Sequence, residues 1–501
     1  MANPSDSLRL WPKPDSHSGL SGIQYHYETR WVECRELPRV HEDYDVELQD
    51  TSGDSDTRRL NNDYYHNEYD AHEKTSKAFI RPWTFLSICW KSSSRGSMMT
   101  NSLWPFTIAA IVLHYYFDEH QLWIFVTAYI GMVPAANLVG FSGHQLARKL
   151  NPTLGILVET AIGSCVELIL LCVLIIQPGN MSIRVIRAVI LGSILANLLL
   201  CLGLCFFVGG IFYPNQSFHV AISEVACNLM LVAGMGLIIP SVFYNSLSLS
   251  STRSINYLDE RALRLSRVVA VVLLAAFFAY LWFQTRSHSG IYQDLLQTED
   301  TPDERRRNKH KAQLTLVESI LAVMAGITFV SFMAVFLVQQ IEVCLGSLFS
   351  PRFRALTSVQ YIVIDRHLSE EFKGLILVPV VEKISEHLTA MHKAHQNQMN
   401  YALAQVLGSS IQTALLNTPL IVLIGWALDK NMSLNFEIFD AAMLLLAIIV
   451  VGSFLRDEKS DYLEGMLSVF VYLLIAVGAY YYPNPESGES GHREGAHSSD
   501  R

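Results

Sequence analysis

Two long apolar segments of the chain, 153–177 and 372–391, carry ionisable side chains. They are Glu159 and Glu167 in the first segment, and Glu382, Lys383, Glu386 and His387 in the second. An ionised side chain at the centre of a bilayer costs about 2.5–3.5 kcal/mol on insertion scales, so residues of this kind are rare and usually functional. Carboxylates in such a place bind cations or protons, and the two segments therefore indicate an ion site.

Small polar residues follow in the next apolar segment of each pair, 185–210 and 401–428. The first contains Ser193 and Asn197, and the second contains Ser409, Ser410, Gln412 and Asn417. Hydroxyl and amide oxygens are ligands that suit a partly dehydrated cation. Residues of these types also serve as packing contacts between membrane helices. Because they accompany the glutamates, we favour roles in or beside the ion site.

The composition identifies the kind of protein that must position these residues. Of the 501 residues, 50% are hydrophobic and only 17% are charged, whereas an average soluble domain is about a quarter charged. The formal net charge of −9 also argues against a nucleic-acid partner. The chain is expected to be a polytopic membrane protein whose main partner is the lipid bilayer.

The hydrophobic pattern predicts an all-α fold with eleven transmembrane helices, since about 20 apolar residues span a bilayer. The predicted spans are 103–117, 122–141, 153–177, 185–210, 219–243, 266–285, 314–339, 372–391, 401–428, 434–455 and 462–482. A polar stretch, 291–313, leaves six spans before it and five after. Setting the first span aside gives five plus five, the arithmetic of two inverted repeats, because an odd number of spans flips the second copy.

The two glutamate-bearing spans occupy matching places in this scheme, since each is the second span of its five-span half. Gly or Pro accompanies the acidic cluster in both. Membrane helices interrupted by Gly or Pro at corresponding places in two repeats point to a midplane ion site.

The polar stretches suggest the domain boundaries and the orientation. The predicted parts are a disordered cytosolic N-terminal tail (1–96), an N-terminal helix with the first five-helix repeat (97–285), a cytosolic loop of mixed charge (286–313), the second five-helix repeat (314–483) and a disordered C-terminal tail (484–501). Basic residues before the first span and in the loop favour a cytosolic N-terminus and a luminal C-terminus. The cysteines show no metal or redox spacing.

Several sequence blocks resemble the calcium/cation antiporter superfamily, in particular its vacuolar Ca2+/H+ exchanger type. NPTLGILVETAIGSCVELI looks like the first signature repeat, usually written G-N-A-x-E-L. GLILVPVVEKISEHLTA, followed by ALAQVLGSSIQTALLNTPLIVLIGW, looks like the second, G-N-x-x-E-H. The similarity runs from about residue 97 to residue 483.

The resemblance implies ten core helices in two inverted repeats plus one N-terminal helix, in the vacuolar or another endomembrane. It implies that Glu167 and Glu386, which match the signature acids, bind cation and proton alternately and are the metal ligands. His387 matches the residue after the second acid. The implied activity is import of a cytosolic cation, Ca2+ in the family, against protons, with no cofactor.

The sequence also departs from the signatures. Ser164 stands where the first signature has Asn, and Glu159 stands where an uncharged polar residue is usual. Glu382 and Lys383 replace the Gly-Asn of the second signature. Two carboxylates suit a divalent ion, whereas two carboxylates and one ammonium leave a net charge of −1, which suits Na+ or K+. Glu159 and Glu382 could restore the lost negative charge, or Glu382 could simply pair with Lys383 away from the site. A divergent fungal branch associated with monovalent cation/proton exchange is compatible with the altered signature.

These observations predict a secondary active transporter with alternating access. The acids exchange protons for a cation, with help from the neutral residues Ser164, Ser193, Asn197, Ser409, Ser410 and Gln412. His387 is expected either to shuttle protons or to orient its neighbours. The selectivity residues would be Glu159, Glu382 and Lys383. A cation channel and a membrane scaffold are the rival interpretations, and a homo-oligomer is left open. No nucleophile–base pair, phosphate-binding loop or metal-ligand cluster indicates an enzyme.

Overall fold

The computed structural model describes residues 82–91, 95–117, 120–177, 180–213, 216–250, 255–287, 314–348 and 369–482. The predictions for the tail up to residue 81, for the loop 288–313 and for the tail 484–501 lie outside the described residues. All elements below are from the described part.

The first half of the membrane region is built from helices that coincide with the predicted spans. They are α4 (Trp104–Tyr116), α5 (Gln121–Ala147), α6 (Pro152–Ile176), α7 (Asn180–Leu195), η1 (Ala196–Cys201), α8 (Leu202–Phe212), α9 (Val220–Ser250), α10 (Ile255–Trp282) and η2 (Phe283–Ser287). Here η1 and η2 are π-helical. Because α7, η1 and α8 follow one another directly, they form one continuous span.

The second half repeats this pattern. Its elements are α13 (Leu316–Leu348), α15 (Glu370–Phe372), η3 (Lys373–Leu377), α16 (Val378–His395), α17 (Met399–Gln412), η4 (Thr413–Asn417), α18 (Thr418–Ala427), α19 (Ile438–Phe454), the 3-10 turn η5 (Leu455–Asp457) and α20 (Tyr462–Tyr481). The π-helical segments η3 and η4 lie inside continuous spans. A two-residue antiparallel ladder joins the halves, with β1 (Gln216–Ser217) paired to β2 (Lys459–Ser460).

The predicted all-α membrane fold is confirmed. Eight helices of the described region are long and apolar enough to cross a membrane. The other three predicted spans fall short for physical reasons: α4 and α19 have 13 and 17 residues, and α16 carries the charged cluster. Five spans from α5 to α10 are followed by five from α13 to α20, with α4 as the extra N-terminal helix.

Several helices are longer than predicted, and α6 is not interrupted. α9, α10 and α13 extend well past the predicted ends of their spans, because a helix continues through polar residues where hydropathy has already fallen. Pro152 begins α6 at the first helical turn, where a missing N–H is tolerated. The irregularities at the site are therefore π-helical turns within continuous helices, not breaks.

The N-terminal tail ends earlier than predicted. α2 (Pro82–Lys91) and the start of α3 (Arg95–Asn101) fall within the stretch that was expected to be disordered. Phe85, Ile88 and Cys89 pack beside Phe141 of α5. Asn101 Nδ2 donates to the Cys89 and Trp90 carbonyls at the end of α2. The apolar packing and the hydrogen bonds of Asn101 thus hold residues in place that were expected to belong to a disordered tail.

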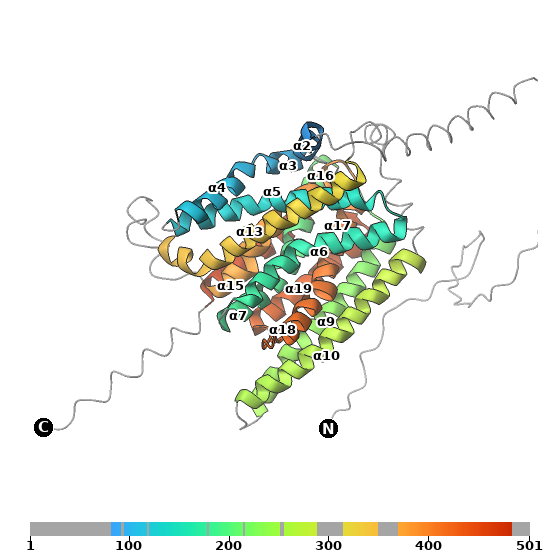
Figure 1. Ribbon diagram of the computed structural model, residues 1–501. Helices are drawn as coiled ribbons and strands as arrows, with labels where there is room; N and C mark the ends of the chain where they lie inside the picture. Colours follow the sequence, from blue (N-terminus) through green and yellow to red (C-terminus); the bar gives the residue numbers. More distant parts are fainter. Residues whose placement is uncertain are drawn as a thin grey trace, which may run out of the picture. The chain divides into compact units, whose positions relative to one another are not determined.

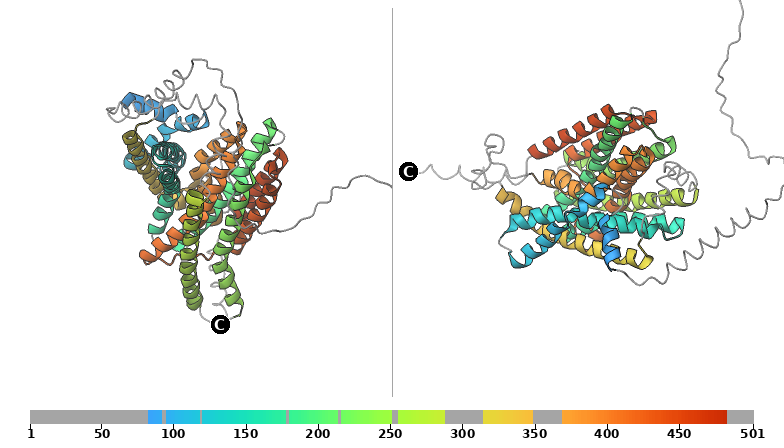
Figure 2. Two further views of the ribbon diagram at one scale, coloured as in Figure 1. Left: turned by 90° about the vertical axis from the view of Figure 1, so that its right-hand side faces the viewer. Right: turned by 90° about the horizontal axis from the view of Figure 1, so that it is seen from above.

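The equivalent first helices of the two halves, α5 and α13, lie side by side although they are far apart in the sequence (Figure 1; Figure 2). α4 packs against α5, and α9 lies along α10 as a long hairpin (Figure 2). One core of buried aliphatic side chains includes residues of both halves, among them Leu170 and Ile190 of the first and Leu375 and Leu403 of the second.

α7 and η3 approach each other closely at two glycines. A Cβ on Gly192 would overlap the carbonyl oxygen of Leu375, and one on Gly374 would meet Ala188. Small residues let the backbones of membrane helices come together in this way. Since η1 continues α7 and α16 continues η3, this contact fixes the spacing of the two helices that carry Asn197 and Lys383.

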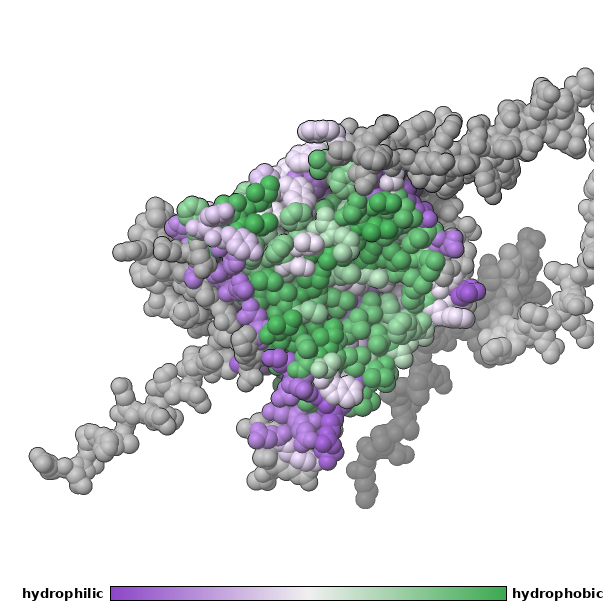
Figure 3. Space-filling model, viewed as in Figure 1, coloured by the Kyte–Doolittle hydropathy of each residue, from purple (hydrophilic) through white to green (hydrophobic). Residues whose placement is uncertain are grey.

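The outer surface of the bundle is apolar. Figure 3 shows a broad hydrophobic face that gives way to a hydrophilic end where α10 begins. Large apolar side chains are exposed on α9 and α10, for example Val232, Met235, Val271, Val272 and Phe278. Exposed apolar area of this extent suits a lipid environment.

Candidate functional site

One ammonium and three carboxylates meet inside the bundle. Lys383 Nζ lies 3.2 Å from Glu167 Oε2, 3.5 Å from Glu382 Oε1 and 3.9 Å from Glu386 Oε2. Glu167 comes from α6 in the first half, and the other three residues come from α16 in the second. The cluster therefore joins the two acid-bearing helices of the repeats.

Glu167 is fully buried and is held by neutral donors. Its Oε2 accepts hydrogen bonds from Thr413 Oγ1 at 2.7 Å and from Asn417 Nδ2 at 2.8 Å. Its Oε1 has no hydrogen-bond partner in the described part of the chain. Hydrogen bonds to a charged acceptor are strong and directional, so η4 fixes one oxygen and leaves the other for a further ligand.

Glu386 is more accessible than Glu167. One third of its side chain is exposed, and its Oε2 accepts a hydrogen bond from Ser409 Oγ at 3.2 Å. Ser409 Oγ also lies 3.5 Å from Lys383 Nζ. The cluster thus contains one fully buried acid, Glu167, and one partly exposed acid, Glu386.

Asn197 links the site to the first half through η1. Its Nδ2 donates to Ser409 Oγ at 3.2 Å, and its Oδ1 lies 3.1 Å from Nε2 of the buried His387. An amide oxygen can only accept, so His387 Nε2 carries a proton in this contact. The imidazole therefore contacts Asn197, a ligand candidate, and no bond between the ring and Glu386 is present among the described hydrogen bonds.

The two π-helical turns η1 and η4 occupy corresponding places in the two halves, each in the helix that follows the acid-bearing one. η1 carries Asn197, and η4 carries Thr413 and Asn417. The wider turn is seen in the hydrogen bonds from the Leu202 N–H to the Asn197 carbonyl and from the Thr418 N–H to the Thr413 carbonyl. π-helical turns are rare and frequently occur at functional sites.

Other predicted residues are placed at the edge of the cluster or outside it. Ser164 Oγ donates to Gln412 Oε1 at 3.3 Å. Ser410 Oγ donates to the Val406 carbonyl of its own helix. Ser193 is buried, and its hydroxyl has no hydrogen-bond partner among the described residues. None of these three contacts a carboxylate of the cluster in the described hydrogen bonds.

Glu159 does not reach the site. Its side chain is 52% exposed and its Oε1 lies 2.9 Å from Nδ1 of His144 on α5. Of the two acids that could compensate the charge of Lys383, only Glu382 is therefore at the cluster.

Thr413 is a site residue that the sequence analysis missed. Ser409, Thr413 and Asn417 are spaced by four residues, which places them on one face of a helix. This spacing was the available signal. Ser409 contacts Glu386, whereas Thr413 and Asn417 contact Glu167, so the stripe serves both acids.

The arrangement is not that of a preformed metal centre. Within the described residues, no group of three or more His, Cys, Asp or Glu side chains is arranged to hold a metal ion. The cation closest to the acids is the chain's own Lys383 ammonium, which lies within 4 Å of all three carboxylates.

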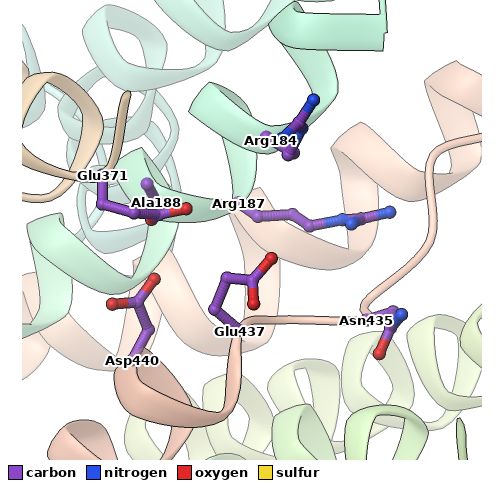
Figure 4. A pocket seen from close by; sticks show the side chains of 7 residues that line it. All are labelled: Arg184, Arg187, Ala188, Glu371, Asn435, Glu437 and Asp440. Atoms are coloured by element: carbon purple, nitrogen blue, oxygen red, sulfur yellow. The ribbon is translucent and has the colours of Figure 1, made fainter. Parts of the chain in front are cut away.

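A second polar cluster lies near the start of α7. Arg184, Arg187, Glu371, Asn435, Glu437 and Asp440 line a small hollow there (Figure 4). Arg187 donates to the Ser433 carbonyl at 2.8 Å and to Ser433 Oγ at 2.6 Å. Figure 4 shows Glu437 and Asp440 rising from the start of α19 toward Arg187 and Glu371. These contacts tie α7 to the segment that precedes α19.

The chain is similar to known exchangers. Residues 120–286 and 318–481 match the sodium/calcium exchanger protein family. Vacuolar cation/proton exchanger 2 of Arabidopsis thaliana is 33% identical over 387 residues, which cover 77% of this chain and 81% of the relative. The vacuolar calcium ion transporter of Schizosaccharomyces pombe is 28% identical over 369 residues, covering 74% and 81%. The solved structure of native YfkE superposes with a TM-score of 0.59 at 21% identity, covering 77% of this chain and all of that one, which shows a shared fold.

Proposed function

Because the chain belongs to the sodium/calcium exchanger protein family, within the calcium/cation antiporter superfamily and of the vacuolar cation/proton exchanger type, we propose that it moves cytosolic Ca2+ into the vacuole in exchange for protons. It is a secondary active transporter of the vacuolar membrane. The observation that carries the proposal is the cluster of three carboxylates at the junction of the repeats.

Glu167 and Glu386 are the proposed exchange residues. Each is a carboxylate that can hold either a proton or a cation, and it cannot hold both tightly. Protons taken up from the acidic lumen are released to the cytosol, where the cation binds in their place. Since one carboxylate belongs to each half of the molecule, relative movement of the halves would open the site to one side at a time.

Neutral oxygens would complete the coordination. Thr413 and Asn417 donate to Glu167. Ser409 donates to Glu386 and accepts a hydrogen bond from Asn197. Hydroxyl and amide groups of this kind replace water around an entering Ca2+. Ser164, Ser193, Ser410 and Gln412 are proposed to act less directly, by packing or by orienting the groups around them.

The charge of the cluster favours a divalent ion. Glu382 joins Glu167 and Glu386, so three carboxylates and one ammonium give a formal charge of −2 when all are ionised. This charge matches one Ca2+. The names of the relatives agree with it, since one is called a vacuolar calcium ion transporter.

A monovalent cation is the second candidate, and Lys383 is the observation in its favour. An ammonium is itself a monovalent cation, and it already lies between Glu167 and Glu386. A place that accommodates this group is suited to an exchange of K+ or Na+ for protons.

Transport in reconstituted vesicles separates these candidates. Vesicles with an acidic interior are given equal external concentrations of Ca2+, Na+ or K+, and cation uptake is measured together with loss of internal protons. We expect Ca2+ to accumulate above its external concentration while protons leave. Uptake that never exceeds equilibrium would indicate a channel, and uphill uptake of K+ or Na+ without Ca2+ would establish the monovalent alternative.

A further inference from the structure

Glu382 is buried in an unusual way. Its side chain is almost completely inaccessible, and the one ion pair that it forms with a described residue is with the Lys383 ammonium at 3.5 Å. Neither Oε1 nor Oε2 has a hydrogen-bond partner among the described residues. Buried carboxylates are normally satisfied by donors, because their desolvation is costly. Glu167, with two neutral donors and the same ammonium, is the contrasting case.

We propose that Glu382 is the carboxylate onto which the Lys383 ammonium withdraws when a transported cation takes its place between Glu167 and Glu386. The inference rests on the proposed function, because it assigns Lys383 and Glu382 a role in loading the exchange site. Glu382 is then a positioning residue that acts through Lys383.

The geometry makes such a movement short. Nζ is already within 4 Å of all three acids and lies only slightly farther from Glu382 than from Glu167. The lysine stem has four methylene groups, so rotation about its bonds moves the ammonium while the backbone of α16 stays in place. Ser409 Oγ lies close to both Nζ and Glu386. Its hydroxyl can keep its hydrogen bond to Glu386 whether the ammonium lies near Glu167 or near Glu382.

The charges explain why the movement would accompany loading. Two cations a few ångströms apart in a site that excludes water repel strongly. An ammonium left between Glu167 and Glu386 would therefore compete with the incoming ion. On Glu382, whose oxygens accept no hydrogen bond from the described residues, the same ammonium keeps a counter-charge.

The test is a double-mutant cycle in reconstituted vesicles, measuring KM and kcat for Ca2+. Glu382→Gln removes the alternative partner of the ammonium, and we expect it to raise KM by roughly tenfold with a smaller change in kcat. Glu382→Gln/Lys383→Met removes the ammonium as well, and we expect KM to return to within about threefold of the wild-type value. Glu159→Gln, which neutralises an exposed acid remote from Lys383, is the matched control and should leave KM unchanged.

Rescue of the single variant by the second substitution is the decisive result. An unchanged KM in Glu382→Gln, or a raised KM that persists in the double variant, overturns the inference. If Glu382→Gln does not yield folded protein, Glu382→Asp carries the test. It keeps the charge but draws it away from Nζ, so it should raise KM by roughly threefold, and an unchanged KM contradicts the proposal.

Failure of the proposed function would look different. If wild-type vesicles show no proton-coupled uptake of Ca2+, Na+ or K+, the exchanger assignment itself is wrong. If the wild type transports Na+ or K+ instead, the same variants are measured with that ion. A transporting wild type with unaffected Glu382 variants removes only the role given to Glu382.

Discussion

Lys383 Nζ lies 3.2 Å from Glu167 Oε2 and joins α16 of the second half to α6 of the first. Both side chains are almost completely buried. Removing one partner of a buried ion pair leaves an uncompensated charge and is strongly unfavourable. The pair therefore couples the two halves in the described conformation, and a cation that binds Glu167 Oε2 would compete with the Lys383 ammonium for this oxygen.

Lys383→Asn is expected to change ion preference. It returns the residue of the family signature and removes the positive charge between the acids, so the site becomes more negative. We expect the ratio of Ca2+ uptake to K+ uptake to rise by roughly tenfold, a size typical of the interaction energy between charged groups in contact. Competition between the two ions in reconstituted vesicles measures the ratio. An unchanged ratio would mean that Lys383 does not face the transported ion.

Thr413→Val is expected to weaken cation binding. The substitution keeps the shape of the side chain and deletes the hydroxyl that donates to Glu167 at 2.7 Å. A hydrogen bond to a charged group contributes about 1.5–3 kcal/mol, so the KM for the cation should rise by roughly 10- to 100-fold.

Thr418→Val is the matched control for this prediction. Thr418 is equally buried, but its hydroxyl donates to the Thr413 carbonyl. Its KM should stay within about threefold of the wild-type value, because it loses a hydrogen bond between neutral groups. Equal effects of the two substitutions would show that η4 is sensitive to any change and would remove the specific role of Thr413.

Gly192→Ala is expected to inactivate the protein by separating α7 from η3. The new methyl group would overlap the Leu375 carbonyl, and backbone cannot move aside as a flexible side chain can. Displacing α7 also displaces Asn197 from Ser409. The melting temperature of the protein in detergent and the rate of Ca2+ uptake should both fall. Gly452→Ala, where a Cβ meets nothing within 4 Å, should leave both unchanged, and a wild-type melting temperature in Gly192→Ala would contradict the packing argument.

Hydropathy was sufficient to predict the membrane fold because each span must be apolar over about 20 residues. The same reasoning exposed Glu167, Glu382, Lys383 and Glu386, since charges within such spans are exceptional. The ends of α9, α10 and α13 were missed because apolar content indicates where the bilayer is, whereas a helix can continue into water.

The side-chain geometry could not be predicted in the same way. Glu159 and Glu167 share one helix and are two turns apart, yet one is 52% exposed and the other fully buried. Only the packing of neighbouring helices decides this. Likewise, the sequence left open whether Glu382 joins the acids or pairs with Lys383 elsewhere, because adjacent residues point in different directions around a helix and the long lysine side chain bridges the difference.

The most direct test of the account is proton-coupled cation flux in Glu167→Gln and Glu386→Gln, measured beside the wild type in vesicles with an acidic interior. Glutamine keeps the size of the side chain and can neither bind nor release the exchanged proton. Protein content and melting temperature of the variants serve as the control for folding. The account predicts uphill Ca2+ uptake with proton loss in the wild type and none in either folded variant. Wild-type flux in a folded variant would contradict the assignment of that glutamate as an exchange residue.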